Sequence, residues 1–321
     1  MKRRHLLAAM GGAPFAASAQ TPDWPRQPLR MILPFAAGGV TDLTARILAP
    51  GLQQRLGQPI IIEGRTGAGG TIAAEVVARA TDGHTLFSTT GATNSIAPAL
   101  FPTLRYDPVR DFQAISFIAR VPHVVLVNPA SGLTNVQELI ALLRREPGRH
   151  NYASTGAGSI THLAPELFLG LAGVQATHIP TRGSGPAIIE LLAGRVTFMI
   201  DALAPAIGQV QQGSLRALAA GTRTRIPNMP ELSTVSEQGL TEFESYTWAA
   251  IYMTAGASPA VVQRLHAATV ATARDSDVAR RFFDLGYELV ASSPEELARI
   301  QQEEYVKWGA VIRRANIKPD T

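Results

Sequence analysis

The stretch LRMILPFAAGGVTD, residues 29–42, decides the fold class. Its apolar start, residues 29–33, predicts a short buried strand that ends at Pro34. A glycine-rich loop follows, and a helical pattern with one apolar face runs from about residue 42 to residue 56. Pro50 and Gly51 should kink this helix, because proline removes a hydrogen bond from a helix interior. Strand, glycine loop and helix in this order indicate an α/β protein.

The same order recurs along the chain. Further strands are expected at residues 59–63, 85–89, 112–119, 123–128, 151–154, 176–179, 196–200, 215–220, 248–253 and 287–290. Further helices are expected at residues 70–80, 135–145, 161–172, 186–193, 259–273 and 294–315. Such alternation is typical of parallel strands joined by right-handed crossovers. We therefore expect mixed, mostly parallel sheets flanked by helices.

The chain is long enough for two domains, at 321 residues. Extended stretches near residues 122 and 246 are candidate crossing points between two lobes. The predicted lobe 1 comprises residues 27–122 and 246–321, and the predicted lobe 2 comprises residues 123–245. The C-terminal helices should then return to pack on lobe 1.

The N-terminus has the layout of a secretory signal peptide. A basic start is followed by a short apolar run to Ala17 and an A-x-A site ending at Ala19. We expect residues 1–19 to be removed near Ala19 during export to the periplasm, by the Sec or, given Arg3-Arg4, the twin-arginine route. The alternative is a cytosolic tail that happens to be basic. Loss of three basic residues lowers the formal net charge from +4 to +1, so nucleic acid is not an expected partner.

The composition excludes several classes of enzyme. The chain has no cysteine, and lysine occurs only at Lys2, Lys307 and Lys318. A P-loop and a Schiff-base site are therefore excluded over most of the chain. There is no G-x-S-x-G motif, and a dinucleotide motif starting at Gly67 fails at Ile72. We expect no catalytic residues, no cofactor and no metal.

Four glycine-rich loops follow predicted strands and carry the functional signal. They occupy residues 34–42, 66–71, 89–94 and 155–161, and the second and fourth share the string Thr-Gly-Ala-Gly. The first turn of a helix offers unpaired N–H groups, and glycine lets a ligand approach them. Such loops can hold a carboxylate without a charged side chain. Alternatively, the glycines only make tight turns.

Three side chains near these loops have two interpretations each. His162 follows the fourth loop and would contact a ligand or the loop backbone; with Glu166, four residues on, it makes only a weak metal candidate. Asp201, at the end of the strand at 196–200, is either a ligand contact or a turn residue. Arg182 either pairs with a second carboxylate or is a surface charge.

These residues resemble the tripartite tricarboxylate transporter receptor family, also called the Bug family. The resemblance is carried by Pro34-Phe35-x-x-Gly38-Gly39-x-x-Asp42, Thr66-Gly67-Ala68-Gly69-Gly70, Tyr106-Asp107-Pro108-x-x-Asp111-Phe112, Tyr152-Ala153-Ser154-Thr155-Gly156, Leu191-Leu192-x-Gly194 and Ala255-Gly256-x-x-Pro259. It runs from about Gln27 to Lys307 in the family's order. It implies a Venus-flytrap fold of the type II periplasmic-binding class, with a ligand held between two lobes.

The resemblance also implies a set of ligand-binding positions: Phe35, Gly38, Thr41, Asp42, Ala68, Gly69, Thr155, Gly156, Ser159 and His162. The loops and strand ends add four candidates: Gly39, Thr90, Arg182 and Asp201. The chain departs from the family pattern at Thr181-Arg182-Gly183, at Asp201-Ala202 and at Gly64-Arg65. All three departures should lie near the cleft, where ligand selectivity is set.

The resulting hypothesis is a monomeric periplasmic receptor for a small carboxylate: a dicarboxylate, tricarboxylate, amino acid or aromatic acid. It would deliver the ligand to the membrane permease subunits of a tripartite tricarboxylate transporter, and the mature chain would not span the membrane. The alternatives are a ligand-reporting partner of a membrane sensor kinase and a periplasmic hydrolase.

Overall fold

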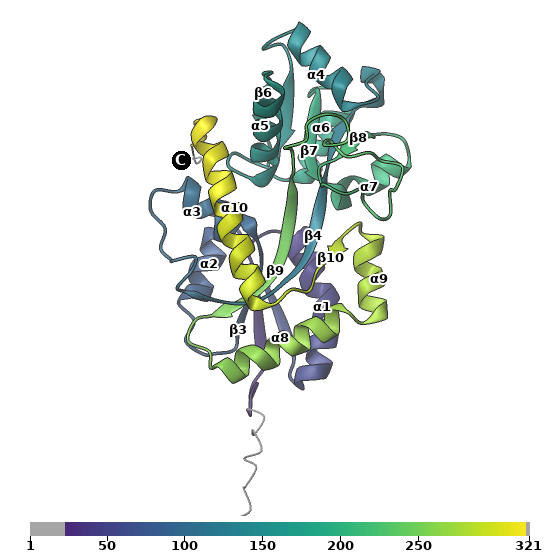
Figure 1. Ribbon diagram of the computed structural model, residues 1–321. Coiled ribbons are helices and arrows are strands. Elements are labelled where there is room, and N and C mark those ends of the chain that lie inside the picture. The colour runs from purple at the N-terminus through teal and green to yellow at the C-terminus, as the bar shows by residue number, and fades with distance from the viewer. Residues whose placement is uncertain (1–22, 319–321) are drawn as a thin grey trace, which may run out of the picture.

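The computed structural model describes residues 23–318, so the predicted signal peptide at residues 1–19 lies outside the described residues. The chain forms two α/β lobes, one above the other in Figure 1. The long strands β4 (Phe112–Val127) and β9 (Tyr246–Thr254) connect them. The two-lobed fold expected from the sequence is confirmed.

Lobe 1 is built on a sheet with the strand order β2-β1-β3-β9-β4. Its parallel strands are β1 (Leu29–Leu33), β2 (Ile60–Gly64) and β3 (Thr85–Thr90). The short strand β10 (Glu288–Leu289) pairs with β4. The helices of this part are α1 (Val40–Leu56), the short turn η1 (Ala68–Gly70), α2 (Thr71–Ala78), the π-helical turn η2 (Ala92–Ile96) and α3 (Ala97–Leu100).

Lobe 2 has its own sheet on the other half of β4. Its strands are β5 (Asn151–Ser154), β6 (Thr177–Pro180), β7 (Phe198–Ala202) and β8 (Arg216–Ala220). The pairs β5–β6 and β5–β7 are parallel, and β4 pairs antiparallel with both β7 and β8. Its helices are η3 (Pro129–Ser131), α4 (Val136–Arg145), α5 (Ile160–Ala172), α6 (Ser184–Leu192) and α7 (Leu203–Gln211). Both sheets are thus mixed, as expected. The expectation that they are mostly parallel was wrong, because within residues 23–318 the antiparallel pairs made by β4 and β9 are at least as numerous as the parallel pairs of each sheet.

The neighbours of β4 change in its middle. Pro122 pairs with Tyr246 of β9 in the first sheet, and the next residue, His123, pairs with Ala202 of β7 in the second. The prediction of two separate strands at 112–119 and 123–128 was therefore wrong, because one strand serves both sheets across Pro122. The lobe boundaries at 122/123 and 245/246 stay a prediction.

Each sheet is covered on both faces, as alternating core residues show. Met31 and Leu33 enter one buried cluster of lobe 1, and Ile32 between them enters another. In lobe 2, the neighbouring residues Val124 and Val125 likewise enter two different buried clusters. Because successive side chains of a strand point to opposite faces, each sheet is the middle layer of three.

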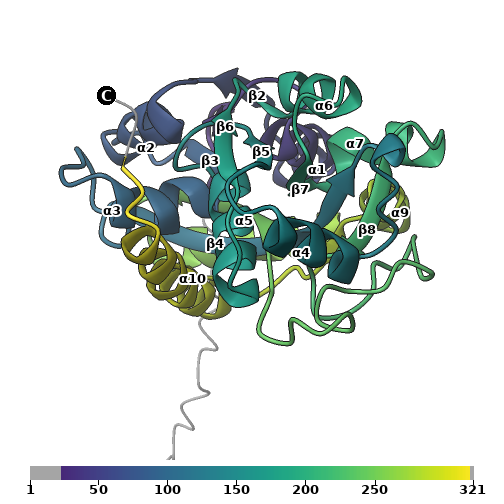
Figure 2. The same cartoon turned by 90° about the horizontal axis from the view of Figure 1, so that it is seen from above.

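The helices after β9 were expected to pack on lobe 1; α8 (Pro259–Ala273) does so, whereas α10 (Pro294–Arg314) contacts both lobes. Helix α8 packs on α1, where a Cβ on Gly51 would lie 2.5 Å from Thr272 Cγ2. Helix α1 runs unbroken through Pro50. The next residue, Gly51, allows the close contact between α1 and α8. Helix α9 (Ser276–Asp284) follows, and α10 lies along both lobes in Figure 1. Figure 2 shows α10 beside α3.

One further prediction is corrected, and two helices were not predicted. Strand β7 covers residues 198–202, so Asp201 lies inside the strand and not after it. Helix α7 was missed because Pro205 and Gly208 inside it are typical loop residues. Helix α9 was missed because it is short and polar. Within residues 23–318, no helix combines the length and the apolar character needed to cross a membrane.

Candidate functional site: glycine loops of two lobes

The three glycine loops of lobe 1 meet at the carboxyl ends of β1, β2 and β3. Gly70 lies at their junction with a left-handed φ of +91°. A Cβ there would lie 2.7 Å from Thr93 Cγ2, 2.9 Å from Pro34 Cβ and 3.2 Å from Phe35 Cζ. Only glycine allows this approach, so Gly70 fixes how the three loops sit against one another.

The first loop is held by its own aspartate. Asp42 is 4% exposed; its Oδ2 accepts the Gly38 N–H at 3.0 Å, and its Oδ1 accepts the Arg46 Nε–H at 2.8 Å. The Thr41 hydroxyl is buried without a hydrogen-bond partner among the described residues, while the Thr41 carbonyl accepts the Ser88 hydroxyl at 3.2 Å. Phe35, Gly38 and Gly39 lie on this loop, at its partly or fully exposed surface.

The second loop has an unusual backbone. Residues 67–70 have φ values of 130°, 46°, 62° and 91°, and Ala68 is the non-glycine among them. Ala68 and Gly69 are exposed, and helix α2 begins directly after Gly70. The Gly70 N–H donates to the Gly67 carbonyl at 2.9 Å within this turn. A turn conformation can direct the remaining backbone N–H groups toward an anion.

The third loop follows β3. Thr90 is 5% exposed, and its hydroxyl accepts the Ala92 N–H at 3.3 Å. Behind it, a Cβ on Gly91 would lie 2.5 Å from Trp248 Nε1, so the indole supports this loop directly. Thr90 is thus brought to the same sheet edge as the first two loops.

The fourth loop, in lobe 2, is organised by hydroxyl groups. The Thr161 hydroxyl accepts the Thr155 N–H at 2.8 Å and lies 2.9 Å from the Ser159 hydroxyl. The Ser159 hydroxyl also donates to the Gly156 carbonyl at 2.6 Å. These bonds shape the loop and leave its donors next to the start of α5.

His162, in the first turn of α5, holds this loop in position. Its Nδ1 accepts the Gly158 N–H at 3.0 Å, and its ring stacks on His178 with centroids 3.6 Å apart. The Ser154 hydroxyl lies 2.6 Å from His178 Nε2. Burial lowers the pKa of His178 to about 4. The sequence did not single out His178, since only the pairing of β5 with β6 brings it to His162.

Asp201 and Arg182 differ sharply in environment. Asp201 is 3% exposed; its Oδ1 accepts the Ala202 N–H at 2.7 Å, while Oδ2 has no partner among the described residues. Burial raises the pKa of Asp201 to about 6, and the hydrogen bond from the Ala202 N–H offsets this only in part. Arg182 is exposed, and no ion pair or hydrogen bond of its side chain is found within residues 23–318.

The fourth loop of lobe 2 is in direct contact with helix α3 of lobe 1. A Cβ on Gly158 of lobe 2 would lie 2.2 Å from Leu100 Cδ2 of α3. Ile96 and Leu163 share a small apolar cluster with Trp308, Val311 and Ile312 of α10. The structure therefore unites the lobe 1 candidates in one place and Thr155, Gly156, Ser159 and His162 in another.

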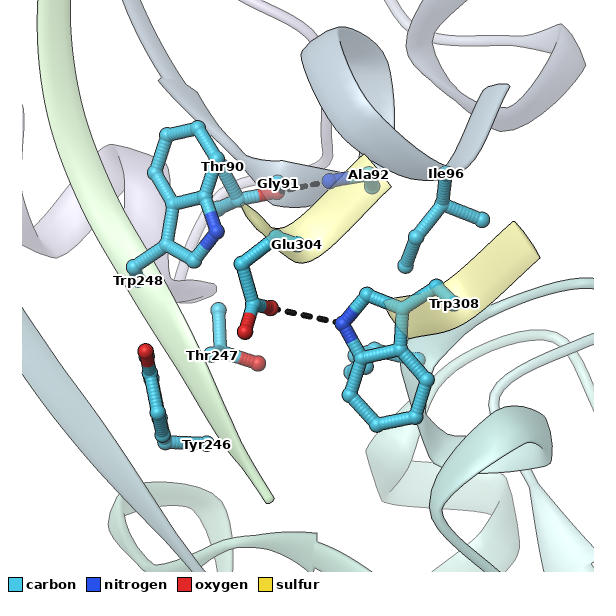
Figure 3. Close-up of a pocket in the computed structure, with 10 residues that line it drawn as sticks. Thr90, Gly91, Ala92, Ile96, Tyr246, Thr247, Trp248, Glu304 and Trp308 are labelled. Carbon is cyan, nitrogen blue, oxygen red and sulfur yellow. Dashed lines mark hydrogen bonds between the residues drawn. The ribbon is translucent and has the colours of Figure 1, made fainter. Parts of the chain in front are cut away.

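A small cavity lies behind the third loop (Figure 3). It has a volume of about 10 Å³, and Thr90 is its sole lining residue from the predicted site. Its other walls come from η2, β9, α10 and the first residue of α5. Sequence reasoning missed Trp248, Glu304 and Trp308, which meet here from distant parts of the chain.

Known proteins show strong similarity to this chain. The family model described as tripartite tricarboxylate transporter family receptor matches residues 44–317. Protein BugT of Bordetella pertussis is 33% identical over 324 residues, with 99% of both chains covered. An R. palustris protein solved with adipate has a TM-score of 0.86 and 32% identity, covering 93% of this chain and 100% of that one. MatC from Rhodopseudomonas palustris with bound malate has a TM-score of 0.81 and 33% identity, covering 90% and 100%.

Proposed function

The chain belongs to the tripartite tricarboxylate transporter receptor family, and from this premise we propose that it is a periplasmic receptor for a small carboxylate. The ligand is held between lobe 1, residues 27–122 and 246–321, and lobe 2, residues 123–245. The receptor is monomeric, catalyses no reaction, and delivers its ligand to the permease subunits of a tripartite tricarboxylate transporter. An export signal at residues 1–19 sends it to the periplasm.

The observation that carries this proposal is the backbone of residues 67–70. Four consecutive residues with a positive φ precede the N-terminus of α2, and Gly70 packs this turn against Phe35 of the first loop. Concave runs of N–H groups and helix N-termini both favour negative charge. One ligand carboxylate therefore binds to the first two loops, with Thr90 beside them. Asp42 holds the first loop in position. The binding residues are Phe35, Gly38, Gly39 and Thr41 in the first loop and Ala68 and Gly69 in the second.

The second end of the ligand binds in lobe 2. Thr155, Gly156, Ser159 and the His162 support form the facing wall. Arg182 is a cation without a side-chain partner in the described chain, and it pairs with a second carboxylate. Asp201 accepts a hydrogen bond from a hydroxyl or amino group of the ligand. The ligands of the two Rhodopseudomonas structures, adipate and malate, fit this arrangement of two polar ends.

A ligand screen tests the proposal. The protein is unfolded, washed and refolded to remove bound molecules, and its melting temperature is measured with monocarboxylates, dicarboxylates, tricarboxylates, amino acids and aromatic acids. At 100 times its dissociation constant, a true ligand adds about 2.7 kcal/mol of stability. Calorimetry then gives the affinity, and mass spectrometry shows whether the ligand is recovered unchanged. Uniform failure of the acids would reject the receptor, and a converted ligand would reject the non-catalytic role.

A further inference from the structure

The cavity behind the third glycine loop contains an unusual pair of polar groups. Trp248 is 1% exposed, and its Nε1–H has no hydrogen-bond partner among residues 23–318. Glu304 is 5% exposed and lies on the opposite wall, on α10. Figure 3 shows the Glu304 carboxylate between the indoles of Trp248 and Trp308.

Among residues 23–318, only one oxygen of this carboxylate has a short hydrogen bond. Oε2 accepts the Trp308 Nε1–H at 2.6 Å. Oε1 lies 3.6 Å from Lys307 Nζ, which is an ion-pair distance but beyond a good hydrogen bond. Burial raises the pKa of Glu304, while Lys307 and the Trp308 indole oppose that shift. A buried donor without a partner and a carboxylate oxygen without a short hydrogen bond thus border the same small space.

The size of that space matches one solvent molecule. Its volume is about 10 Å³, close to the minimum that holds a single water. Buried waters typically bridge polar groups that the protein leaves unpaired. We propose that this cavity is a binding site for one water molecule, which accepts the Trp248 Nε1–H and donates to Glu304 Oε1.

The bridge has a positioning role. Trp248 Nε1 lies against the backbone of Gly91, between Thr90 and Ala92. Glu304 lies on α10. Trp308, about one helical turn further along α10, belongs to the apolar cluster that also contains Ile96 of lobe 1 and Leu163 of lobe 2. The water therefore links α10 to the strand β9 and, through the indole, to the third loop.

The tryptophan indoles make the site directly measurable. The chain has three tryptophans, and the other two Nε1–H groups donate to protein oxygens, Trp24 to the Gly83 carbonyl at 2.8 Å and Trp308 to Glu304. In protein labelled with ¹⁵N-tryptophan, the Trp248 indole proton should show a cross-relaxation peak to a long-lived water. The Trp24 indole proton, assigned with the Trp24→Phe variant, should show none.

A high-resolution crystal structure provides the second measurement. Density for one water within hydrogen-bond distance of both Trp248 Nε1 and Glu304 Oε1 is expected, and it should disappear in Trp248→Phe, whereas Trp24→Phe should retain it. A cavity without density and without the cross-relaxation peak overturns the proposal. Water that persists unchanged in Trp248→Phe overturns it as well. If that variant does not fold, the wild-type measurements decide. No ligand is needed, so the result is independent of the proposed receptor function.

Discussion

Arg314, in the last turn of α10, donates its Nη2–H to the carbonyl of Glu166 on α5 at 3.2 Å. Its guanidinium also covers Gly170, where a Cβ would lie 2.5 Å from Arg314 Cζ. Helix α10 packs on lobe 1 over most of its length, and this contact ties its end to lobe 2. Figure 1 shows the helix passing from one lobe to the other.

A double-mutant cycle tests this contact. Arg314→Ala should lower the free energy of unfolding by about 1 kcal/mol through the lost hydrogen bond. Gly170→Ala should stabilise the helix interior by up to about 1 kcal/mol, but only after Arg314 is removed. Urea unfolding of the wild type, the two single variants and the double variant measures both changes in unfolding free energy. Additive effects, or an equal loss in the control Arg313→Ala, would contradict the contact.

Gly70→Ala should disrupt all three loops of lobe 1 together. The added Cβ meets Thr93, Pro34 and Phe35 within 3.2 Å, in addition to the left-handed strain. We expect a loss of about 2–4 kcal/mol in unfolding free energy and a large loss of ligand affinity. Gly132→Ala is the matched control, because Gly132 has a φ of +75° and its added Cβ would have no atom of the described chain within 4 Å. Similar losses in both variants would show that strain alone is responsible.

Asp201→Asn should stabilise the protein at neutral pH. The folded-state pKa of Asp201 is raised from 3.8 to about 6, so the folded chain holds a proton between these values that the unfolded chain has lost. Stability therefore falls as pH rises through this window, and the cost at pH 7 is about 1–3 kcal/mol. Unfolding at pH 4 and pH 7 measures it; Asp284→Asn, at an exposed site, is the control. Ligand affinity should fall, since Asp201 is proposed to contact the ligand.

His123 should have the opposite effect in acid. It is fully buried between the hydroxyls of Ser245, at 2.7 Å, and Thr247, at 2.9 Å. Burial, and then the charge of Lys307, lower its pKa to about 3. The unfolded chain binds this proton first, so stability is lost as pH falls from about 6.5 toward 3, by up to about 1.4 kcal/mol per pH unit.

The His123→Gln variant isolates this contribution. Its unfolding free energy should depend less on pH between 4 and 6 than that of the wild type, and urea titrations at several pH values measure the slope. The same change at His84, near the surface, is the comparison. An unchanged slope in His123→Gln would mean that His123 does not carry the acid sensitivity.

Arg182→Ala should reduce affinity selectively. A charge-assisted hydrogen bond is worth about 1.5–3 kcal/mol, so dicarboxylate binding should weaken about 10- to 150-fold. Monocarboxylate binding and the melting temperature should change little. Arg149→Ala removes another exposed lobe 2 arginine without a side-chain partner in the described chain, and should leave both affinities unchanged. Equal weakening for both ligand types would place Arg182 outside the second subsite.

Local sequence patterns predicted the elements with strong periodicity or clear ends. Helix α8 has the predicted bounds of residues 259–273, since Ser258 caps it and Pro259 begins it. Strands β1 and β5 were also predicted with their observed bounds. The glycine loops were found because a strand, a turn and a helix start leave a readable signal within about ten residues.

Other features have no such local signal. β4 reads as two strands because Pro122 interrupts its pattern, and only the change of partner from Tyr246 to Ala202 makes it continuous. His178 reaches His162 through sheet pairing, and Trp248 reaches Glu304 through the packing of α10. Proximity between residues far apart in the chain depends on the whole fold, which no short stretch encodes.

The sequence alone therefore determined the α/β class, the four glycine loops and the family, because these depend on local backbone preferences and on the order of motifs. The tertiary structure decided what each side chain does. It buries the Asp201 carboxylate, leaves Arg182 unpaired within the described chain, and places Glu304 opposite the Trp248 indole. Burial and pairing set these properties, since both depend on atoms contributed by other parts of the chain.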